Sequence, residues 1–211
     1  SASSGFHPSR IRPADPASPA VPSPEGATPI CLAMYYGQPA IAETIADAKG
    51  DLDVFEAAVL GRVDRMKTLL DMDPSLVTGS SGDGFPLLGL ACYFRQPDVA
   101  RLLLDRGANP TQAATNVAKV APLHAAVAAD QPRIAAWLLD AGADVNARQQ
   151  IEFTPLMGAA ANARLELLEL LLARGADASA ITTEGKTAAD LAREHGHDEV
   201  ADRLERLTGI A

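Results

Sequence analysis

The chain has 211 residues, of which 47% are hydrophobic, 21% charged and only 4% aromatic, so it is long enough for one domain or one short repeat array. Its 41 alanines favour helices and, with nine aromatic residues, argue against a β-sandwich or barrel. The formal net charge of −9 and the lack of any Lys/Arg cluster argue against binding to nucleic acid or to an anionic membrane, and they favour a neutral or basic protein partner.

No segment has the features of a signal peptide or a membrane span. The longest apolar run, 85–94, contains Pro86 and Gly89, and its ten residues are too few, because a membrane-spanning helix needs about 20. Cys31 and Cys92 give neither a disulfide framework nor a metal-ligand spacing. We therefore expect a cytoplasmic protein, and a periplasmic or secreted location stays open because the sequence begins with Ser1 instead of Met.

Residues 1–26 differ from the rest of the chain in composition, and we expect an extended or disordered proline-rich arm. Seven of the 15 prolines lie in residues 1–29. Polyproline II has three residues per turn, so prolines that recur every three residues line one edge of such an arm. They are Pro13, Pro16, Pro19 and Pro22. Composition alone favours a linker or tail, whereas the spacing of Arg10, Pro13 and Pro16 is typical of segments that bind in aromatic grooves.

From Gly26 onward the sequence repeats with a period near 33 residues. An anchor recurs at residues 29, 53, 86, 122, 155 and 188, so the successive spacings are 24, 33, 36, 33 and 33. In the later units a leucine-rich run and a Gly-Ala pair follow this anchor. The pattern divides the chain into units of about 27–50, 51–83, 84–119, 120–152, 153–185 and 186–209.

Local chemistry explains why these residues recur. A threonine at the N-cap accepts a hydrogen bond from a first-turn amide, and a proline at the first helical position loses no hydrogen bond. A polar residue two positions after the proline, as at His124, is placed to bond back to the cap. Glycine ends the second helix in the left-handed conformation. The residues of this signature are Thr28, Pro29, Pro86, Pro122, His124, Thr154, Pro155, Thr187, Gly107, Gly142 and Gly175.

Residues 121–126 (APLHAA) and 154–160 (TPLMGAA) are similar to the signature of the ankyrin repeat, a family with the same period. The resemblance covers residues 26 to about 207. It implies an all-α solenoid of six helix pairs joined by short β-turn fingers and preceded by the proline-rich arm. It also implies a non-enzymatic, monomeric module that needs no cofactor and binds a protein partner through its fingers and the concave face of its first helices.

Departures from a regular repeat predict local differences. The first spacing is nine residues short, so residues 49–51 should join the first two helix pairs without a finger. The third interval is three residues long. We place one extra residue between the helices, near residues 93–95, and two in the finger 108–120, which should project further than its neighbours. The second unit ends in Met72-Asp73-Pro74 instead of glycine.

The positions six and seven residues after each anchor are expected to face outward from the first helices. In the first three units they carry large apolar residues, and we expect a contact patch made by Tyr35, Tyr36, Leu60, Tyr93 and Phe94. The alternative is that the short first linker twists the first unit so that these residues pack inward. A third hypothesis is that the proline-rich arm lies across the patch, within the chain or as a swapped arm in a dimer.

Two other places carry candidate residues. On the fourth finger, Gln149 and Gln150 are expected to contact a partner, together with Phe153, which directly precedes Thr154 and is expected to be half-buried. Trp137 falls on the leucine stripe of the fourth unit, so we expect it in the core.

Catalytic motifs are absent from the sequence. The glycine-rich stretch 79–84 neither follows a strand nor opens a helix, and it falls where a finger tip belongs. One alternative function is self-association through the apolar patch, with the proline-rich arm covering it or swapping onto it. A further alternative is a metal-dependent enzyme that uses a C-terminal cluster of histidines and acids. A catalytic metal site needs three converging ligands and an open position. The cluster consists of Asp190, Glu194, His195, His197, Asp198 and Glu199.

Overall fold

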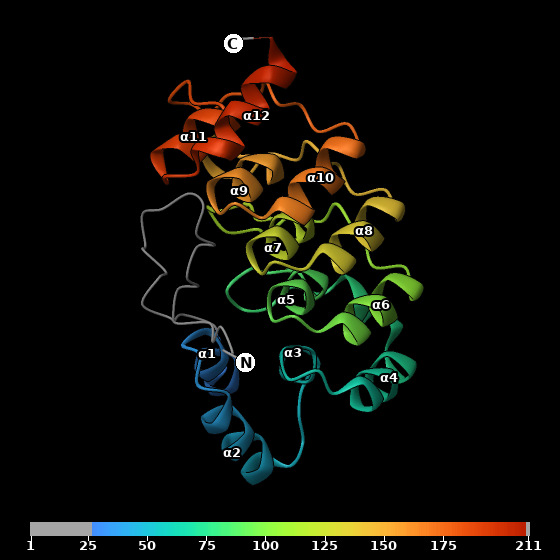
Figure 1. Cartoon of the computed structure of the whole chain (residues 1–211). Coiled ribbons are helices and arrows are strands. Elements are labelled where there is room, and N and C mark those ends of the chain that lie inside the picture. The colour runs from blue at the N-terminus through green and yellow to red at the C-terminus, as the bar shows by residue number, and fades with distance from the viewer. Residues whose placement is uncertain (1–26, 210–211) are drawn as a thin grey trace.

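A computed structural model describes residues 27–209, and this part of the chain is helical with no β-strand, which confirms the predicted all-α class. The proline-rich arm 1–26 lies outside the described residues. The helices form six consecutive pairs, each made of a first and a second helix (Figure 1). The pairs are α1 (Pro29–Tyr35) and α2 (Pro39–Lys49), α3 (Val54–Val59) and α4 (Val63–Met72), α5 (Leu87–Tyr93) and α6 (Pro97–Asp105), α7 (Pro122–Ala128) and α8 (Pro132–Asp140), α9 (Pro155–Ala161) and α10 (Leu165–Ala173), and α11 (Ala188–Glu194) and α12 (Asp198–Thr208).

The helices lie in two layers. The first helices α1, α3, α5, α7, α9 and α11 contact one another in chain order, and the second helices α4, α6, α8 and α10 do the same (Figure 1). The core runs between the layers. Each second helix from α4 onward buries at least one leucine almost completely, while the first helices face it with small residues such as Ala91 and Ala126. These leucines are Leu70, Leu103, Leu138, Leu167, Leu168, Leu171 and Leu204.

Threonine and proline begin several first helices. The hydroxyl of Thr28 accepts a hydrogen bond from the amide of Cys31 at 3.3 Å, and Thr187 accepts one from the amide of Asp190 at 3.2 Å. Three of the signature prolines occupy the first helical position, where no amide hydrogen is needed. They are Pro29, Pro122 and Pro155. The glycines after the second helices adopt left-handed backbone angles, with φ of 83° at Gly107 and 93° at Gly142.

His124 does not bond back to the cap of its own helix. Its N-cap residue, Ala121, receives no side-chain hydrogen bond. The Nε2 atom of His124 lies instead 3.1 Å from the carbonyl oxygen of Phe153, in the next finger. The capping box that we expected at this position forms elsewhere, where the third helical residue is Glu56 or Asp190. These acidic side chains reach back to the amides of their own caps, whereas the buried imidazole links neighbouring units.

The third unit has no extra residue between its helices, and the segment between α4 and α5 is as long as that between α8 and α9. The loop from α5 to α6 is three residues long, as is the loop from α7 to α8. The hydrogen bond from the Gln96 amide to the Ala91 carbonyl oxygen corresponds to that from the Gln131 amide to the Ala126 carbonyl oxygen, and both measure 2.9 Å. Pro86 therefore precedes the helix instead of starting it, in extended backbone with ψ of 147°. The extra residue predicted near residues 93–95 is therefore wrong: Pro86 is the N-cap of α5, whereas Pro122 is the first residue of α7, so the spacing between these two prolines is one residue longer than the spacing between the two helix starts.

Neighbouring fingers are linked at their tips by backbone hydrogen bonds. The amide of Thr115 donates to Gly84 at 2.9 Å, that of Gln150 to Ala118 at 3.1 Å, and that of Thr183 to Ile151 at 3.0 Å. The segment between α6 and α7 is two residues longer than that between α8 and α9, as the repeat spacing predicts. The fourth finger contains the short 3-10 helix η3 (Gln150–Glu152). The finger tips thus form a continuous bonded edge along the solenoid.

The first unit is joined to the second without a finger. Gly50 ends α2 with φ of 73°, and α3 begins four residues later. The carboxylate of Glu56, which is 1% exposed, accepts hydrogen bonds from the Lys49 ammonium at 2.6 Å and the Asp53 amide at 3.1 Å. In Figure 1, α2 lies apart from α4, and close contact between these units runs through α1 and α3. The first unit is therefore attached by fewer contacts than the others.

The second unit ends without glycine. After α4, Asp73 accepts a hydrogen bond from the amide of Ser75 at 3.0 Å and thereby caps the 3-10 helix η2 (Pro74–Thr78). Aspartate is a good capping acceptor because its short side chain reaches the amides of the following turn. Within residues 27–209, no helix is long and apolar enough to cross a membrane.

Candidate functional site

The aromatic residues at the ends of α1 and α5 form one cluster. The ring centroid of Tyr35 lies 5.9 Å from that of Tyr93 and 4.8 Å from that of Phe94, and the last two rings are 5.1 Å apart. These are favourable distances for tilted and edge-to-face ring pairs. The cluster joins the first unit to the third across the second, whose equivalent residues Val59 and Leu60 are buried and smaller. Small residues in the middle unit leave room for the rings from both sides to meet.

Packing within the cluster changes which residues are accessible. Tyr35 is only 6% exposed and Leu60 only 9%, so the expectation that these two face outward is wrong. Tyr93 and Phe94 are half-buried, and Tyr36 is 51% exposed. Burial raises the pKa of the Tyr93 hydroxyl to about 12 and raises the pKa of Tyr35 further. Both hydroxyl groups therefore remain protonated at neutral pH.

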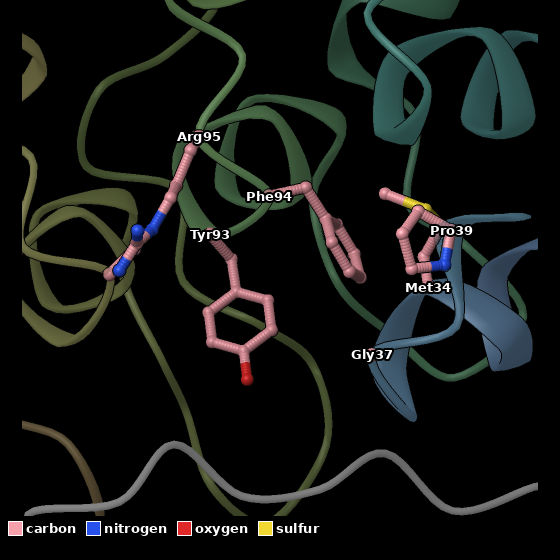
Figure 2. A pocket seen from close by; sticks show the side chains of 7 residues that line it. Met34, Gly37, Pro39, Tyr93, Phe94 and Arg95 are labelled. Atoms are coloured by element: carbon pink, nitrogen blue, oxygen red, sulfur yellow. The ribbon is translucent and has the colours of Figure 1, made fainter. Parts of the chain in front are cut away.

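A pocket of about 300 Å³ opens beside the cluster. Its walls come from the ends of α1 and α5, the start of α2 and the residue that follows α7 (Figure 2). In Figure 2 the ring of Phe94 points toward Met34 and Pro39, while the Tyr93 hydroxyl points away from the α5 backbone. The lining residues are Met34, Gly37, Pro39, Tyr93, Phe94, Arg95 and Ala129. The pocket thus has apolar and aromatic walls with one cation among its lining residues.

Arg95 is the charged residue of this pocket. Its side chain is exposed, and among residues 27–209 its guanidinium has no ion-pair or hydrogen-bond partner. Its backbone is left-handed, with φ of 60°. The same register in three other units holds glycine with φ between 66° and 79°: Gly37, Gly61 and Gly196. Arg95 therefore occupies a backbone conformation that costs a non-glycine residue about 1 kcal/mol.

Sequence reasoning missed most of this pocket. Tyr93 and Phe94 were expected, whereas Met34, Gly37 and Arg95 were not. The sequence gives no specific signal for Arg95, because the second residue after the first helix is glycine in three units but Asp130 and Ala163 occupy the same left-handed position in two others. It gives none for Met34 either, since the place of this residue beside the third unit depends on how the first unit packs.

The fourth finger carries one exposed candidate and one buried residue. Gln150 is exposed and Gln149 half-buried, whereas Phe153 is only 3% exposed. The expectation that Phe153 contacts a partner is therefore wrong, because its ring is in the core. Its carbonyl oxygen accepts hydrogen bonds from Nε2 of His124 and from the Gln149 amide. Ile151, at the tip, is left-handed with φ of 60°.

Trp137 lies at the surface edge of the second-helix layer. It is half-buried and packs against the core without being enclosed by it, so the expectation that it is a core residue holds only in part. The guanidinium of Arg133 lies 4.6 Å from the centroid of its ring and that of Arg101 lies 5.8 Å away. The Arg133 contact is a cation–π pair within α8, and the longer Arg101 contact joins α6 to α8 across neighbouring units.

The C-terminal histidines and acids do not converge on a common point. In the described part of the chain, no three His, Cys, Asp or Glu residues lie close enough together to hold a metal ion. The acids have structural contacts: Asp190 accepts the Thr187 amide at 2.8 Å, and Glu194 pairs with Lys186 at 3.0 Å. The donor set required by a metal-dependent enzyme is therefore not assembled by this cluster.

Comparisons with known proteins agree with the repeat geometry. A family model of ankyrin repeats in three copies matches residues 54–149 and 123–207. The chain is 37% identical over 155 residues, 73% of its length, to Neurogenic locus notch homolog protein 4 of Homo sapiens, of which it covers 7%. It is 32% identical over 153 residues, 71% of its length, to Glycerophosphocholine phosphodiesterase gde1 of Schizosaccharomyces pombe, of which it covers 13%.

A shorter relative is matched over most of its own length. The chain is 32% identical over 121 residues, 57% of its length, to Ankyrin repeat domain-containing protein 37 of Mus musculus, of which it covers 75%. The notch and gde1 matches span only a small fraction of those proteins, so their common element with this chain is the repeat region. With six helix pairs of the expected register and a family model that matches most of its length, the chain belongs to the ankyrin repeat family.

Proposed function

We propose that this chain binds a protein partner non-covalently through the concave face of its first helices, with the pocket beside Phe94 as the main contact. Ankyrin repeats are in general protein–protein interaction modules, and the family is generally non-enzymatic. The observation that carries the choice of surface is the pocket of about 300 Å³ with aromatic walls. Concave apolar sites with a few polar groups are where proteins commonly bind ligands.

The energetics favour this surface because its walls are already in place. Tyr35 holds the ring of Phe94 at 4.8 Å between centroids, so little side-chain freedom remains to be lost on binding. An apolar side chain of the partner that fills the pocket contributes about 2–3 kcal/mol through burial. Tyr36, which is 51% exposed, adds an aromatic contact next to the pocket.

The charges of the chain indicate what kind of protein surface fits this site. The net charge of −9 favours the approach of a neutral or basic protein surface. Locally, the guanidinium of Arg95, which has no ion-pair partner among residues 27–209, suits one carboxylate beside the apolar anchor of the partner. Gln149 and Gln150 on the fourth finger are a second proposed contact for a partner that extends along the finger edge.

The proposal is tested by affinity capture from a lysate of the source organism, followed by mass spectrometry. The baits are the wild type and the double variant Tyr36→Ser with Phe94→Ser. The control is Met72→Ser, which removes an apolar side chain that is 77% exposed on α4, in the other helix layer. We expect a protein retained by the wild type and the control and lost by the double variant, whose fold is checked by circular dichroism. Capture of the same proteins by all three baits would contradict the proposed surface.

The alternative of self-association through the same surface makes a different prediction. A chain that pairs with itself through the pocket has an average mass that rises with concentration, as measured by light scattering. We expect a constant monomer mass, because the aromatic rings of the cluster already contact one another. A mass that doubles for the wild type and not for the double variant would support self-association.

A further inference from the structure

We infer that the pocket is occupied, when no partner is bound, by the proline-rich arm of the same chain, with the segment around Pro16, Pro19 and Pro22 lying against Tyr93 and Phe94. The arm would then act as an internal ligand that a partner has to displace. This inference rests on the pocket and the arm, and it does not depend on the identity of the partner.

The walls of the pocket have the chemistry that a polyproline II segment requires. Such segments bind in aromatic grooves, because their prolines pack flat against rings and their backbone has no internal hydrogen bonds. Tyr93 and Phe94 supply the rings, and Met34 and Pro39 supply an apolar wall opposite (Figure 2). The Tyr93 hydroxyl, which burial keeps protonated, is a donor for a free backbone carbonyl of the bound segment.

The arm is attached beside the pocket and has sufficient reach. It ends at residue 26, next to the N-cap of α1, while Met34 and Gly37 lie at the other end of that helix. The seven residues of α1 correspond to about 10 Å at about 1.5 Å per residue. Polyproline II advances about 3.1 Å per residue, so about four residues cover that distance. Pro22 and Pro19 are therefore within reach of the pocket when the arm folds back along α1.

Charge supports the same direction of binding. Arg95 lies on the side of the pocket contributed by the third unit, away from α1, and its guanidinium has no partner among the described residues. Asp15 directly precedes Pro16, so an arm that places Pro19 and Pro22 near α1 carries this carboxylate toward Arg95. A guanidinium–carboxylate bond is among the stronger hydrogen bonds in proteins.

The covalent attachment of the arm favours the arm of the same chain over the arm of a second copy as the occupant of the pocket. A segment tethered within a short distance of its site experiences an effective concentration of roughly millimolar. An arm from another molecule has only the bulk concentration, so at low protein concentration the arm of the same chain occupies the pocket.

The test uses the full chain with a nitroxide attached at Ser18→Cys. Ser18 lies off the edge formed by the prolines, so the label leaves their contact surface free. The native cysteines do not compete, because both are buried and burial raises the thiol pKa, to about 11 for Cys31. The signals observed are the methyl groups of Met34, which lines the pocket, and of Met72, which is exposed on α4 and serves as an internal reference.

A docked arm and a merely tethered arm are distinguished by variants. We expect the nitroxide to remove most of the Met34 methyl signal and to spare Met72. This effect should diminish when Pro16, Pro19 and Pro22 are changed to Ser, which leaves the helical domain untouched, and when Phe94→Ser removes a wall of the pocket. Equal broadening of Met34 in all these chains would mean that the arm is only nearby, and would overturn the inference.

Two further experiments test the direction of the arm and whether it belongs to the same chain: an exchange of charges between Arg95 and Asp15, and the mixing of labelled with unlabelled chains. Arg95→Glu should weaken the broadening of Met34, and combining it with Asp15→Arg should restore it. Failure of the exchange to restore the signal loss would overturn the assigned direction of the arm. Mixing spin-labelled chains with isotope-enriched unlabelled chains should leave Met34 sharp, and broadening in that mixture would replace the internal ligand by an arm swapped between two copies. Each of these outcomes is independent of whether a partner is captured.

Discussion

His124 shows how one side chain connects two repeats. It is buried, and its Nε2 atom lies 3.1 Å from the carbonyl oxygen of Phe153 in the following finger. Desolvation by burial lowers the pKa of the imidazole to about 4, so His124 is neutral in the folded chain at pH 7. In the unfolded chain its pKa has the ordinary value of about 6.5. The two states therefore bind different numbers of protons between these values.

This difference predicts a loss of stability on acidification. Below pH 6.5 the unfolded chain binds a proton at His124 that the folded chain excludes, so the free energy of unfolding falls until the pH reaches about 4. The full effect of this one group is about 3 kcal/mol. Urea unfolding of wild type and His124→Asn at pH 7, 6 and 5 measures it. We expect the wild type to lose more stability over this range, and parallel curves would contradict the assignment.

At the scale of elements, the finger tips show where glycine is required by a neighbouring unit. Gly84 has φ of 87°, and its carbonyl oxygen accepts the Thr115 amide at 2.9 Å. A Cβ atom at Gly84 would lie 2.7 Å from the Thr115 hydroxyl oxygen and 3.1 Å from the Asn116 amide nitrogen. Gly142, at the end of α8, has φ of 93° but no atom within 4 Å of such a Cβ. The two glycines differ in packing and not in backbone conformation.

Alanine substitutions at these glycines separate backbone strain from packing. Gly142→Ala should lower the free energy of unfolding by about 1 kcal/mol, the cost of a left-handed alanine. Gly84→Ala should lower it further, because the added methyl group also displaces Thr115 and breaks the bond between the second and third fingers. Chemical unfolding compares the two variants, and amide exchange at Thr115 should accelerate only in Gly84→Ala. Equal losses would mean that the contact between finger tips contributes nothing.

At the scale of the whole molecule, the first unit is the one that separates most readily. Repeat proteins are stabilised by contacts between neighbours, so each junction has its own strength. Here the finger is missing, α2 does not pack closely on α4, and the buried carboxylate of Glu56 connects Lys49 at the end of α2 to the start of α3. The same junction holds Met34 and Pro39 against the third unit, and it therefore determines whether the pocket exists.

Glu56→Ala should loosen the first unit selectively. It removes the capping box of α3 and the acceptor for Lys49, which together amount to about 2 kcal/mol. Hydrogen exchange followed by mass spectrometry should show faster exchange in α1 and α2 than in α7 to α12. The control is Glu43→Ala, which removes the partner of Arg62 in an exposed pair and should change stability by less than about 0.5 kcal/mol. Uniform acceleration along the chain would contradict a weak first junction.

Much of the fold could be predicted because it depends on interactions within a few residues. The period of 33 residues and the helical class follow from patterns that each unit carries by itself. The caps at Thr28 and Thr187 and the left-handed ends at Gly107 are likewise local, since the donor and acceptor lie within one helical turn. The missing first finger follows from a spacing of 24, which leaves no residues to form one.

The candidate site could be predicted only in part, because it depends on packing between distant segments. The sequence alone selected Tyr36, Tyr93 and Phe94, but it did not show that Tyr35 turns inward to contact Phe94 across an intervening unit. It also placed an extra residue after α5, where the loop has the regular length, and it expected Phe153 to be a half-buried partner contact, whereas it is buried. Sequence by itself thus determined the repeat, its caps and its charge, since these are properties of single residues and single turns. Only the tertiary structure decided which side chains are buried and where the pocket opens, because that depends on how three successive units pack together.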